Sequence, residues 1–214
     1  MKKCAGGKRS GIKWILASAS PRRKDILSRL GLRCIVDPSG IQEPPRNPRE
    51  KPSSYASRVA SLKARKAAEK RNSGIIISAD TIVVLGNSIL GKPADRMEAK
   101  NMLRRLSGRW HEVISSVCLI DCSAQIERST YSKTRVHFRR ISAAELEWLL
   151  QSGEYRDKAG AYGAQGNASL FIDKIEGCFF NVVGFPIAAF ETLCRKIGID
   201  LVPKALKAGQ RDIT

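Results

Sequence analysis

The residues best suited to chemistry in this sequence are a carboxylate and a lysine that flank a predicted β-hairpin. Asp80 stands between two short apolar runs, residues 75–77 and 81–85, which we predict to be buried strands. A carboxylate in that setting is costly unless it is paired, hydrogen-bonded or bound to a metal. A glycine-containing turn and a short returning arm follow, and Lys92 stands at the end of this arm, where Pro93 stops the strand. The pattern predicts that an acid and a base meet at one end of a sheet. The alternative is that Asp80 caps a turn while Lys92 is solvated.

The same stretch nearly matches the phosphate-loop motif, but Pro93 excludes it. Gly86, Gly91 and Lys92 have the spacing of that motif, which needs Ser or Thr as the next residue to hold the metal. Proline has no N–H group and disfavours helical dihedral angles at the residue before it.

A second candidate site is the start of a predicted helix that follows the first strand, residues 14–17. Ser20 is placed as the N-cap and Pro21 at the first helical position. Arg22 and Arg23 follow, although cations are unfavourable at the positive end of a helix dipole. A bound phosphate would reverse that argument, because free N–H groups and arginine forks both favour anions. The alternative is that these side chains point into water.

Two more charged residues are candidates. Glu43 lies in a loop rich in Gly and Pro, either as a metal ligand or as a surface acid, and spacing alone favours the surface acid. Lys63 lies on a predicted helix, residues 53–71, at the border of an apolar stripe that includes Val59 and Ala60. A lysine there either snorkels to the surface or faces a cleft.

A glycine-punctuated loop, residues 157–166, is the last candidate. Its glycines let the backbone approach a ligand closely. Lys158 and Gln165 offer polar contacts, and Tyr162 can stack or pack. Composition alone favours a plain surface loop equally.

The remaining pattern places these residues on a mixed framework. A helix capped by Asp95, a long pair of antiparallel strands and a capping box at Ser142 follow the central hairpin. We expect a further hairpin from residues 170–175 and 179–183. Because βα steps alternate with hairpins, the sequence predicts an α/β protein with an elongated mixed sheet flanked by helices, in two lobes with a central cleft.

Histidine and cysteine usage argues against several types of site. His111 and His137 are the only histidines and lie far apart, which disfavours a histidine-based metal site or a Ser-His-Asp triad and favours structural roles. The six cysteines form no C-x-x-C pair and show no zinc-site spacing, so we expect reduced structural thiols.

Chain length and net charge limit the possible domain organisation and the possible binding partners. The 214 residues, 43% of them hydrophobic, suit one domain with a sizeable core. We assign residues 14–198 to it, between a basic flexible leader at 1–13 and a basic tail at 199–214. No apolar run is long enough to span a membrane, and the leader lacks the apolar stretch of a signal peptide, so we expect a cytoplasmic protein. The 38 Lys and Arg against 20 acidic residues give a net charge of +18, which favours anionic partners: nucleotides, nucleic acid or acidic surfaces.

Several stretches together resemble one known family. In chain order they are 17–23, 78–83, 90–93, 106–108 with His111, 157–163 with Gln165-Gly166, and 183–186. Each alone is weak, but in this order over residues 14–198 they resemble the Maf family of nucleoside triphosphate pyrophosphatases, also called septum-formation proteins.

The resemblance implies a fold, a reaction and a cofactor. Family members have a long mixed sheet with a cleft between two lobes, a Maf/ITPase-like architecture, and are often homodimers. They hydrolyse nucleoside triphosphates to the monophosphate and pyrophosphate with a divalent cation, usually Mg²⁺ or Mn²⁺. The loop 157–166 is similar to that of the branch acting on dTTP and UTP, whereas the branch acting on 7-methyl-GTP has a different sequence there.

The resemblance also assigns eight residues to one site. Asp80 would be the catalytic acid residue, as metal ligand or as base for the attacking water, and Glu43 would join it as a catalytic residue and metal ligand. Lys92 would be the third catalytic residue. The substrate-binding residues would be Ser20, Arg22 and Arg23 at the helix N-terminus, together with Lys63 and Gln165.

Departures from the family pattern are modest. Ala164 replaces a larger aliphatic residue, Phe185 replaces leucine, and Ser115-Ser116 replaces a threonine-led pair. The changes at Ala164 and at Ser115-Ser116 bear on the pocket for the base. They therefore affect which base is preferred rather than the type of reaction.

Two other hypotheses are open. One is a non-catalytic nucleic-acid-binding or cell-division regulatory protein on the same fold, motivated by the charge of +18. The other is an inosine triphosphate-type pyrophosphatase, which shares the chemistry but not these motifs. The intact acid and phosphate-site residues favour the Maf-type enzyme.

Overall fold

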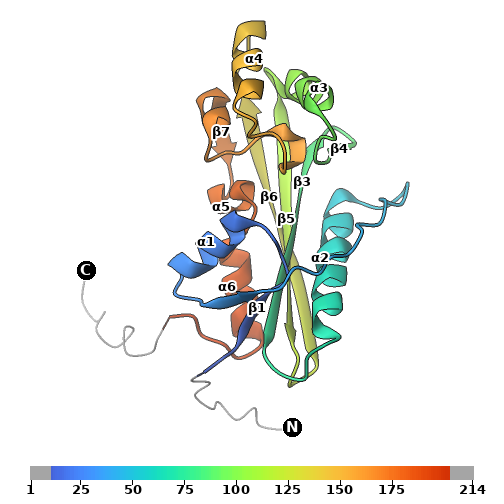
Figure 1. Ribbon diagram of the computed structural model, residues 1–214, viewed down its shortest axis with the longest axis vertical. Coiled ribbons are helices and arrows are strands. Elements are labelled where there is room, and N and C mark those ends of the chain that lie inside the picture. Colours follow the sequence, from blue (N-terminus) through green and yellow to red (C-terminus); the bar gives the residue numbers. More distant parts are fainter. Residues whose placement is uncertain (1–10, 203–214) are drawn as a thin grey trace, which may run out of the picture.

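The computed structural model describes residues 11–202, so most of the predicted leader and tail lies outside the described residues. Within this range a mixed sheet of seven strands forms the long axis of the molecule (Figure 1). The strand order is β2-β1-β3-β5-β6-β7, and β4 pairs with β3 off this path. The strands are β1 (Trp14–Leu16), β2 (Cys34–Val36), β3 (Ile75–Leu85), β4 (Ser88–Leu90), β5 (Trp110–Asp121), β6 (Ile126–Phe138) and β7 (Ile172–Glu176). This confirms the elongated mixed sheet predicted from the sequence.

Strand β3 is the central element of the sheet. It pairs with β1 in parallel and with β5 in antiparallel orientation, so its ladder is filled on both sides. The two apolar runs around Asp80 were predicted as separate strands, but they form one continuous strand that passes through Asp80. The prediction of a returning arm is confirmed, because Val83 pairs with Leu90 across the turn.

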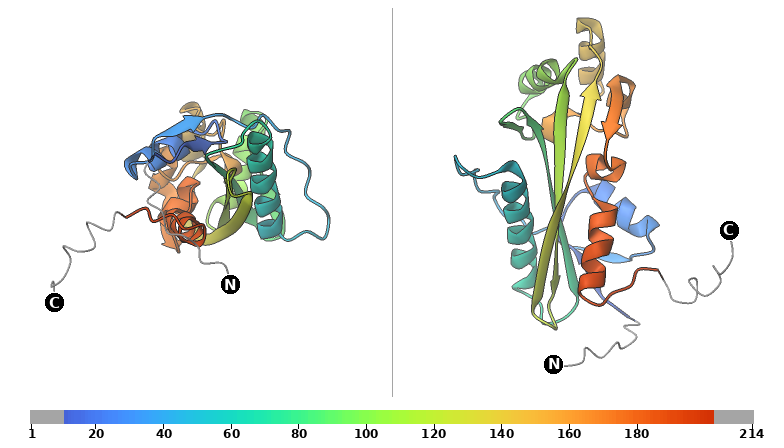
Figure 2. Two further views of the ribbon diagram at one scale, coloured as in Figure 1. Left: turned by 90° about the horizontal axis from the view of Figure 1, so that it is seen from below. Right: turned by 180° about the vertical axis from the view of Figure 1, so that it is seen from behind.

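Helices cover both faces of this sheet (Figure 2). Helix α2 lies on one face, and α1 and α6 lie on the other. The helices are α1 (Pro21–Arg29), α2 (Pro52–Ala68), α3 (Arg96–Leu106), α4 (Ala143–Gln151), α5 (Phe179–Val183) and α6 (Ile187–Lys196), with short 3₁₀ turns at η1 (Ala159–Ala161) and η2 (Asn167–Phe171). The predicted capping box is present at Ser142 and Glu145, and Asp95 caps α3 through the N–H of Glu98.

The hairpin predicted from residues 170–175 and 179–183 is wrong. The first segment ends η2 and then forms β7, which pairs with β6 instead. The second segment is helix α5, which ends at Gly184 with a positive φ of 111°. The apolar residues of this segment have strand propensity, but tertiary contacts override it because Asn181 has to reach the interior of the sheet.

Two separate groups of buried side chains support the two-lobe architecture. One group includes Leu103, Phe138 and Phe171 and packs α3, α4 and the loop before β7 against one end of the sheet. The other includes Leu16, Phe185 and Phe190 and packs α1 and α6 against the opposite end.

Asn181 joins β5, β6 and α5 through its fully buried carboxamide. Its Oδ1 accepts from the N–H of Ser115 at 3.0 Å, and its Nδ2 donates to the carbonyl of Val113 and to Oγ1 of Thr134, both at 2.9 Å. Asparagine can satisfy both groups because it carries an acceptor and two donors on one planar group. The attachment of α5 to β5 and β6 therefore depends in part on this side chain.

Replacing Asn181 with alanine tests this dependence. We expect the Asn181→Ala variant to lose about 3 kcal/mol in free energy of unfolding, because it leaves buried backbone groups without partners. Urea denaturation measures the loss, with the exposed Asn101→Ala on α3 as the control that stays near wild type. A loss below about 1 kcal/mol would contradict the assignment, because a single net hydrogen bond is worth that much.

Candidate active site

Three predicted site residues meet around one ammonium group. The Nζ of Lys63 lies 2.7 Å from Oδ1 of Asp80 and 2.6 Å from Oε1 of Glu43. The Asp80 side chain is 7% exposed and that of Lys63 is 14% exposed, whereas that of Glu43 is 47% exposed. Asp80 is therefore not merely the cap of a turn, and Lys63 is not merely a lysine that snorkels to the surface.

Strand geometry explains why Asp80 points toward α2. Side chains alternate along a strand, and the neighbouring Ser78 donates its hydroxyl to the carbonyl of Ala60 in α2. Asp80 lies on the same face of β3 as Ser78, opposite Lys63. Lys63 stands one turn further along α2 than Val59 and Ala60. Glu43 reaches the pair from the loop between β2 and α2.

Positive charges from three residues act on Glu43 in this cluster. Burial raises the pKa of Glu43, but the hydrogen bond from Lys63 and the charges of Lys63, Lys92 and Arg23 lower it further, so the net effect is a pKa below the ordinary value. Lys92 therefore lies within electrostatic reach of Glu43, whereas the hairpin pattern predicted that it meets Asp80. Lys63 contacts one oxygen of each carboxylate, Oδ1 of Asp80 and Oε1 of Glu43, so the second oxygen of each is left for a further cation.

The donor set fits a hard divalent cation bound together with a substrate. Mg²⁺ is commonly held by one or two carboxylates, with substrate phosphates and water completing its shell. Asp80 and Glu43 supply two such carboxylates, and in the described residues no group of three or more His, Cys, Asp or Glu is placed to hold a metal alone.

Arg23 is bonded inside the protein. Its guanidinium donates to the carbonyl of Gly184 at 3.0 Å, to the carbonyl of Ala79 at 2.8 Å, and to the hydroxyls of Ser18 at 3.0 Å and Thr81 at 3.1 Å. Burial lowers its pKa, and the charge of Asp80 opposes that effect. This geometry favours a positioning role for Arg23: it holds the first turn of α1 against β3.

The start of α1 has the features of an anion site. Ser20 is the N-cap residue, but its side chain makes no capping hydrogen bond, which leaves the first-turn N–H groups without that partner. Arg22 follows and, among the described residues, forms no salt bridge. Arg22 rather than Arg23 is therefore the arginine whose guanidinium is free to bind phosphate.

The loop 157–166 lies close to both the hairpin and α1. The N–H of Gly160 donates to the carbonyl of Gly91 at 3.0 Å, next to Lys92. Burial, and next the charge of Arg22, lower the pKa of Lys158. Gly160 has a φ of +68°, and a Cβ there would meet the side chain of Val83 at 3.0 Å, so only glycine fits. Gln165 is exposed on this loop.

The Maf-like protein family matches residues 13–197 of this sequence. The chain belongs to the Maf-like protein family. A dTTP/UTP pyrophosphatase of Syntrophomonas wolfei is 43% identical, covering 87% of this chain and 98% of that protein. Two more proteins of that name are similar: one from Desulforamulus reducens at 44% identity, covering 88% and 98%, and one from Pyrococcus furiosus at 45%, covering 82% and 90%. Among solved structures, the Ham1 protein of Staphylococcus aureus aligns with a TM-score of 0.43 at 11% identity, covering 59% of this chain and 71% of that one.

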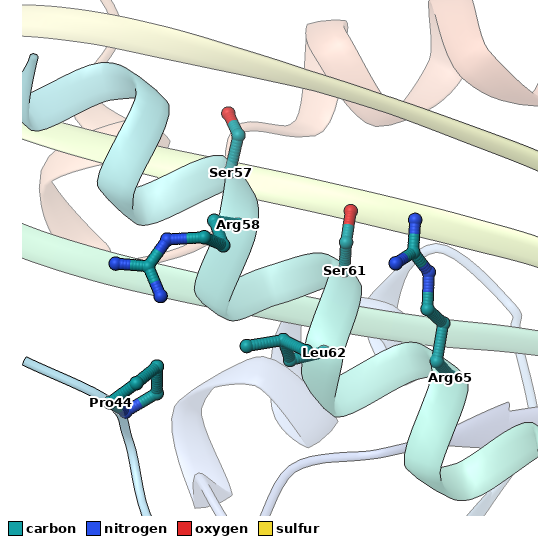
Figure 3. Close-up of a pocket in the computed structure, with 6 residues that line it drawn as sticks. All are labelled: Pro44, Ser57, Arg58, Ser61, Leu62 and Arg65. Carbon is teal, nitrogen blue, oxygen red and sulfur yellow. The ribbon is translucent and has the colours of Figure 1, made fainter. Parts of the chain in front are cut away.

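A cavity of about 470 Å³ flanks the acid cluster of this Maf-like protein on α2 (Figure 3). Pro44 and Leu62 line it. Pro44 directly follows Glu43 in the chain, and Leu62 directly precedes Lys63. Its two arginines are both neutralised: Arg58 pairs with Glu50 and Arg65 pairs with Glu127. The cavity therefore lacks the free positive charge that a triphosphate needs, and we do not assign the substrate to it.

Ser115 and Ser116 were expected to bear on base preference, but they are fully buried. The hydroxyl of Ser115 donates to the carbonyl of Asn181, and the hydroxyl of Ser116 donates to that of Thr130. Ala164 is also buried, in the core around α3 and α4. These departures from the family pattern are therefore part of the packing rather than of a ligand-contacting wall.

His111 and Tyr162 anchor the loop 157–166 from beneath, a pairing that spacing alone does not reveal. The Nε2 of His111 and the hydroxyl of Tyr162 share a hydrogen bond of 2.7 Å, and both rings pack edge-on against Phe138. Burial lowers the pKa of His111 to about 4 and raises that of Tyr162. The structural role predicted for His111 is confirmed.

The lowered pKa of His111 predicts a pH-dependent stability. As pH falls below 6.5 the unfolded chain protonates this histidine, but the folded chain does so only near pH 4. Stability is therefore complete above pH 6.5, and the site contributes a loss of about 2 kcal/mol between pH 7 and pH 5. Urea unfolding at both pH values should show this loss in the wild type and in His137→Gln, but not in His111→Gln. Equal losses in all three proteins would refute the assignment.

Proposed function

We propose that this protein hydrolyses dTTP and UTP, with modified pyrimidine nucleotides as further candidates, to the monophosphate and pyrophosphate. The observation that carries the proposal is the Lys63 ammonium held between the carboxylates of Asp80 and Glu43. Relatives at 43–45% identity over most of the chain bear the name dTTP/UTP pyrophosphatase. The non-catalytic alternative is not favoured, because a protein that only binds has no need of a buried acid cluster.

The triphosphate binds at the start of α1 in this proposal. The first-turn N–H groups at Ser20 and the guanidinium of Arg22 take the phosphate oxygens. Arg23 keeps that turn fixed through its bonds to Gly184 and Ala79. Lys92 and Gln165 close the pocket from the hairpin and from the loop 157–166. In this proposal the substrate lies in the cleft that the sequence predicts between the two lobes.

The reaction breaks the bond between the α- and β-phosphorus. Water attacks the α-phosphorus in line with the departing pyrophosphate, whose developing charge requires nearby cations. Asp80 and Glu43 would hold Mg²⁺ or Mn²⁺, which supplies charge neutralisation and lowers the pKa of a bound water. Lys63 keeps both carboxylates oriented. Two roles are open to Asp80: metal ligand, or base that takes the proton of the attacking water.

The proposal extends to assembly and location. Homodimer formation is implied by the family resemblance, and a cytoplasmic location is the expectation from sequence. In the described residues no helix is both long and apolar enough to cross a membrane.

Asp80→Asn is the direct test of the reaction. We expect pyrophosphate release from dTTP and UTP to fall on the order of a thousandfold, because several kcal/mol of transition-state stabilisation is removed. The matched control is Asp173→Asn, on β7, which should keep wild-type activity. Calorimetric titration with Mn²⁺ then separates the two roles: loss of binding identifies a ligand, and retained binding identifies a base. Undiminished turnover in Asp80→Asn would remove Asp80 from the mechanism.

We expect replacement of Arg22 to affect substrate binding and replacement of Arg23 to affect stability. Arg22→Ala should raise KM for dTTP about tenfold at unchanged stability, because it removes one charge-assisted hydrogen bond to phosphate. Arg23→Ala should lower the free energy of unfolding by roughly 2–4 kcal/mol, because it leaves buried carbonyls without donors. Steady-state kinetics and urea denaturation of both variants distinguish the roles, and the opposite pattern would exchange them.

A further inference from the structure

The loop that carries Glu43 is held in place by side chains. It runs between β2 and α2, and residues 38–46 form no backbone-to-backbone hydrogen bond with any other described residue. Three prolines in this stretch, Pro38, Pro44 and Pro45, have no N–H group to donate. The position of Glu43 beside Asp80 therefore depends on the side chains that reach this loop from other elements.

Arg58 on α2 makes such a contact two residues from Glu43. Its Nη2 donates to the carbonyl of Pro45 at 3.1 Å. The same guanidinium binds both carboxylate oxygens of Glu50, through Nε at 2.8 Å and through Nη2 at 2.7 Å. Glu50 also accepts the N–H of Asn47 at 3.2 Å. One arginine thus fixes the loop at Pro45 and at Glu50, with the directional geometry of a bidentate pair.

The surroundings of Arg58 keep its side chain in one orientation. Its Cζ lies 5.4 Å from the centroid of the Tyr55 ring, within cation–π range. The side chain of Glu50 is only 12% exposed and that of Arg58 is 32% exposed. Burial raises the pKa of Tyr55, and the charges of Asp80 and Glu43 raise it further, so this ring also lies within electrostatic reach of the acid cluster.

Arg65 on the same helix forms a pair of the same kind that does not involve the loop. It binds both oxygens of Glu127 at 2.8 and 3.2 Å, but Glu127 belongs to β6, and the side chain of Arg65 is 63% exposed. Figure 3 shows Arg58 extending toward the part of the loop that carries Pro44, whereas Arg65 extends toward the strands. The two arginines therefore differ in what they hold, and Arg65 is a natural control.

We propose that Arg58 and Glu50 are positioning residues that hold Glu43 beside Asp80 for the binding of a divalent cation. The inference rests on the proposed function, in which these two carboxylates hold the metal. Lys63 contacts the carboxylate of Glu43, whereas Arg58 holds the backbone beside it, so α2 fixes the residue at two points. Residues that hold a metal ligand in this way typically change metal affinity or activity 10–100-fold when they are replaced.

The kinetic test uses Arg58→Gln, Glu50→Gln, the double variant and the control Arg65→Gln. The measured quantity is the Mn²⁺ concentration that gives half-maximal release of pyrophosphate from dTTP. We expect it to rise about tenfold or more in both single variants and to change less than about twofold in Arg65→Gln, because an exposed ion pair contributes little. The double variant should be no worse than either single one, because both residues act through one contact.

Arg58→Lys separates shape from charge. It keeps the positive charge but loses the planar fork that binds Glu50 and Pro45 together. We expect it to resemble Arg58→Gln in its requirement for Mn²⁺, and wild-type behaviour would show that charge alone is needed and would contradict the positioning role.

A second measurement needs neither metal nor nucleotide. The N–H groups of Asn47 and Glu50 donate hydrogen bonds within the loop, and their exchange with solvent, followed by NMR, reports local opening. We expect exchange about tenfold faster in Arg58→Gln than in the wild type, with no change in the amides of β3. Arg65→Gln should match the wild type throughout.

Several outcomes would overturn the proposal. Unchanged exchange in Arg58→Gln would show that the arginine does not hold the loop. Faster exchange with an unchanged Mn²⁺ requirement would show that the loop does not position a metal ligand. Wild-type kinetics in Glu50→Gln beside impaired Arg58→Gln would show that Arg58 acts directly on the substrate. If the wild type releases no pyrophosphate from any nucleotide, the proposed function fails, and the exchange measurement still decides whether Arg58 fixes the loop.

Discussion

The ion pair between Lys63 and Asp80 is the interaction on which the site depends. A carboxylate that is almost completely buried in the middle of a central strand loses its hydration, and only a close counter-charge offsets that cost. Lys63 supplies the charge from α2, and it also pairs with Glu43 in the loop between β2 and α2. One ammonium group thus links the two carboxylates of the cluster.

Strand β3 contacts both the acid cluster and the start of α1, because consecutive side chains along a strand point to opposite faces of the sheet. Asp80 faces α2 and the acid cluster, whereas Thr81 faces Arg23, Gly184 and α1. From Thr81 the polar contacts continue through the hydroxyl of Ser115 to Asn181. The carboxylate that we propose as catalytic and the N-terminus of α1 are therefore held by adjacent residues of one strand, as precise sites on rigid elements require.

The net charge is +18, and the basic side chains differ in whether a carboxylate lies next to them. Many basic side chains on α2 and β6 are matched by a nearby carboxylate, and exposed pairs of that kind contribute little to stability. Arg22 at the start of α1 is among the described cations that form no salt bridge. In our proposal this charge at the start of α1 serves a triphosphate.

The sequence by itself determined the strands around Asp80, the returning arm to Lys92, the capped helices and the family, because these depend on local periodicity, turn residues and motif order. It did not determine that Lys63 bridges Asp80 and Glu43, since this contact joins segments that are distant in the chain. It also predicted a hairpin where α5 stands, because the strand propensity of residues 179–183 is local whereas the partners of Asn181 lie on β5 and β6. Only the tertiary structure decided that Arg23 is held inside the protein while Arg22 is left free, because two adjacent arginines differ solely in what the fold places around them.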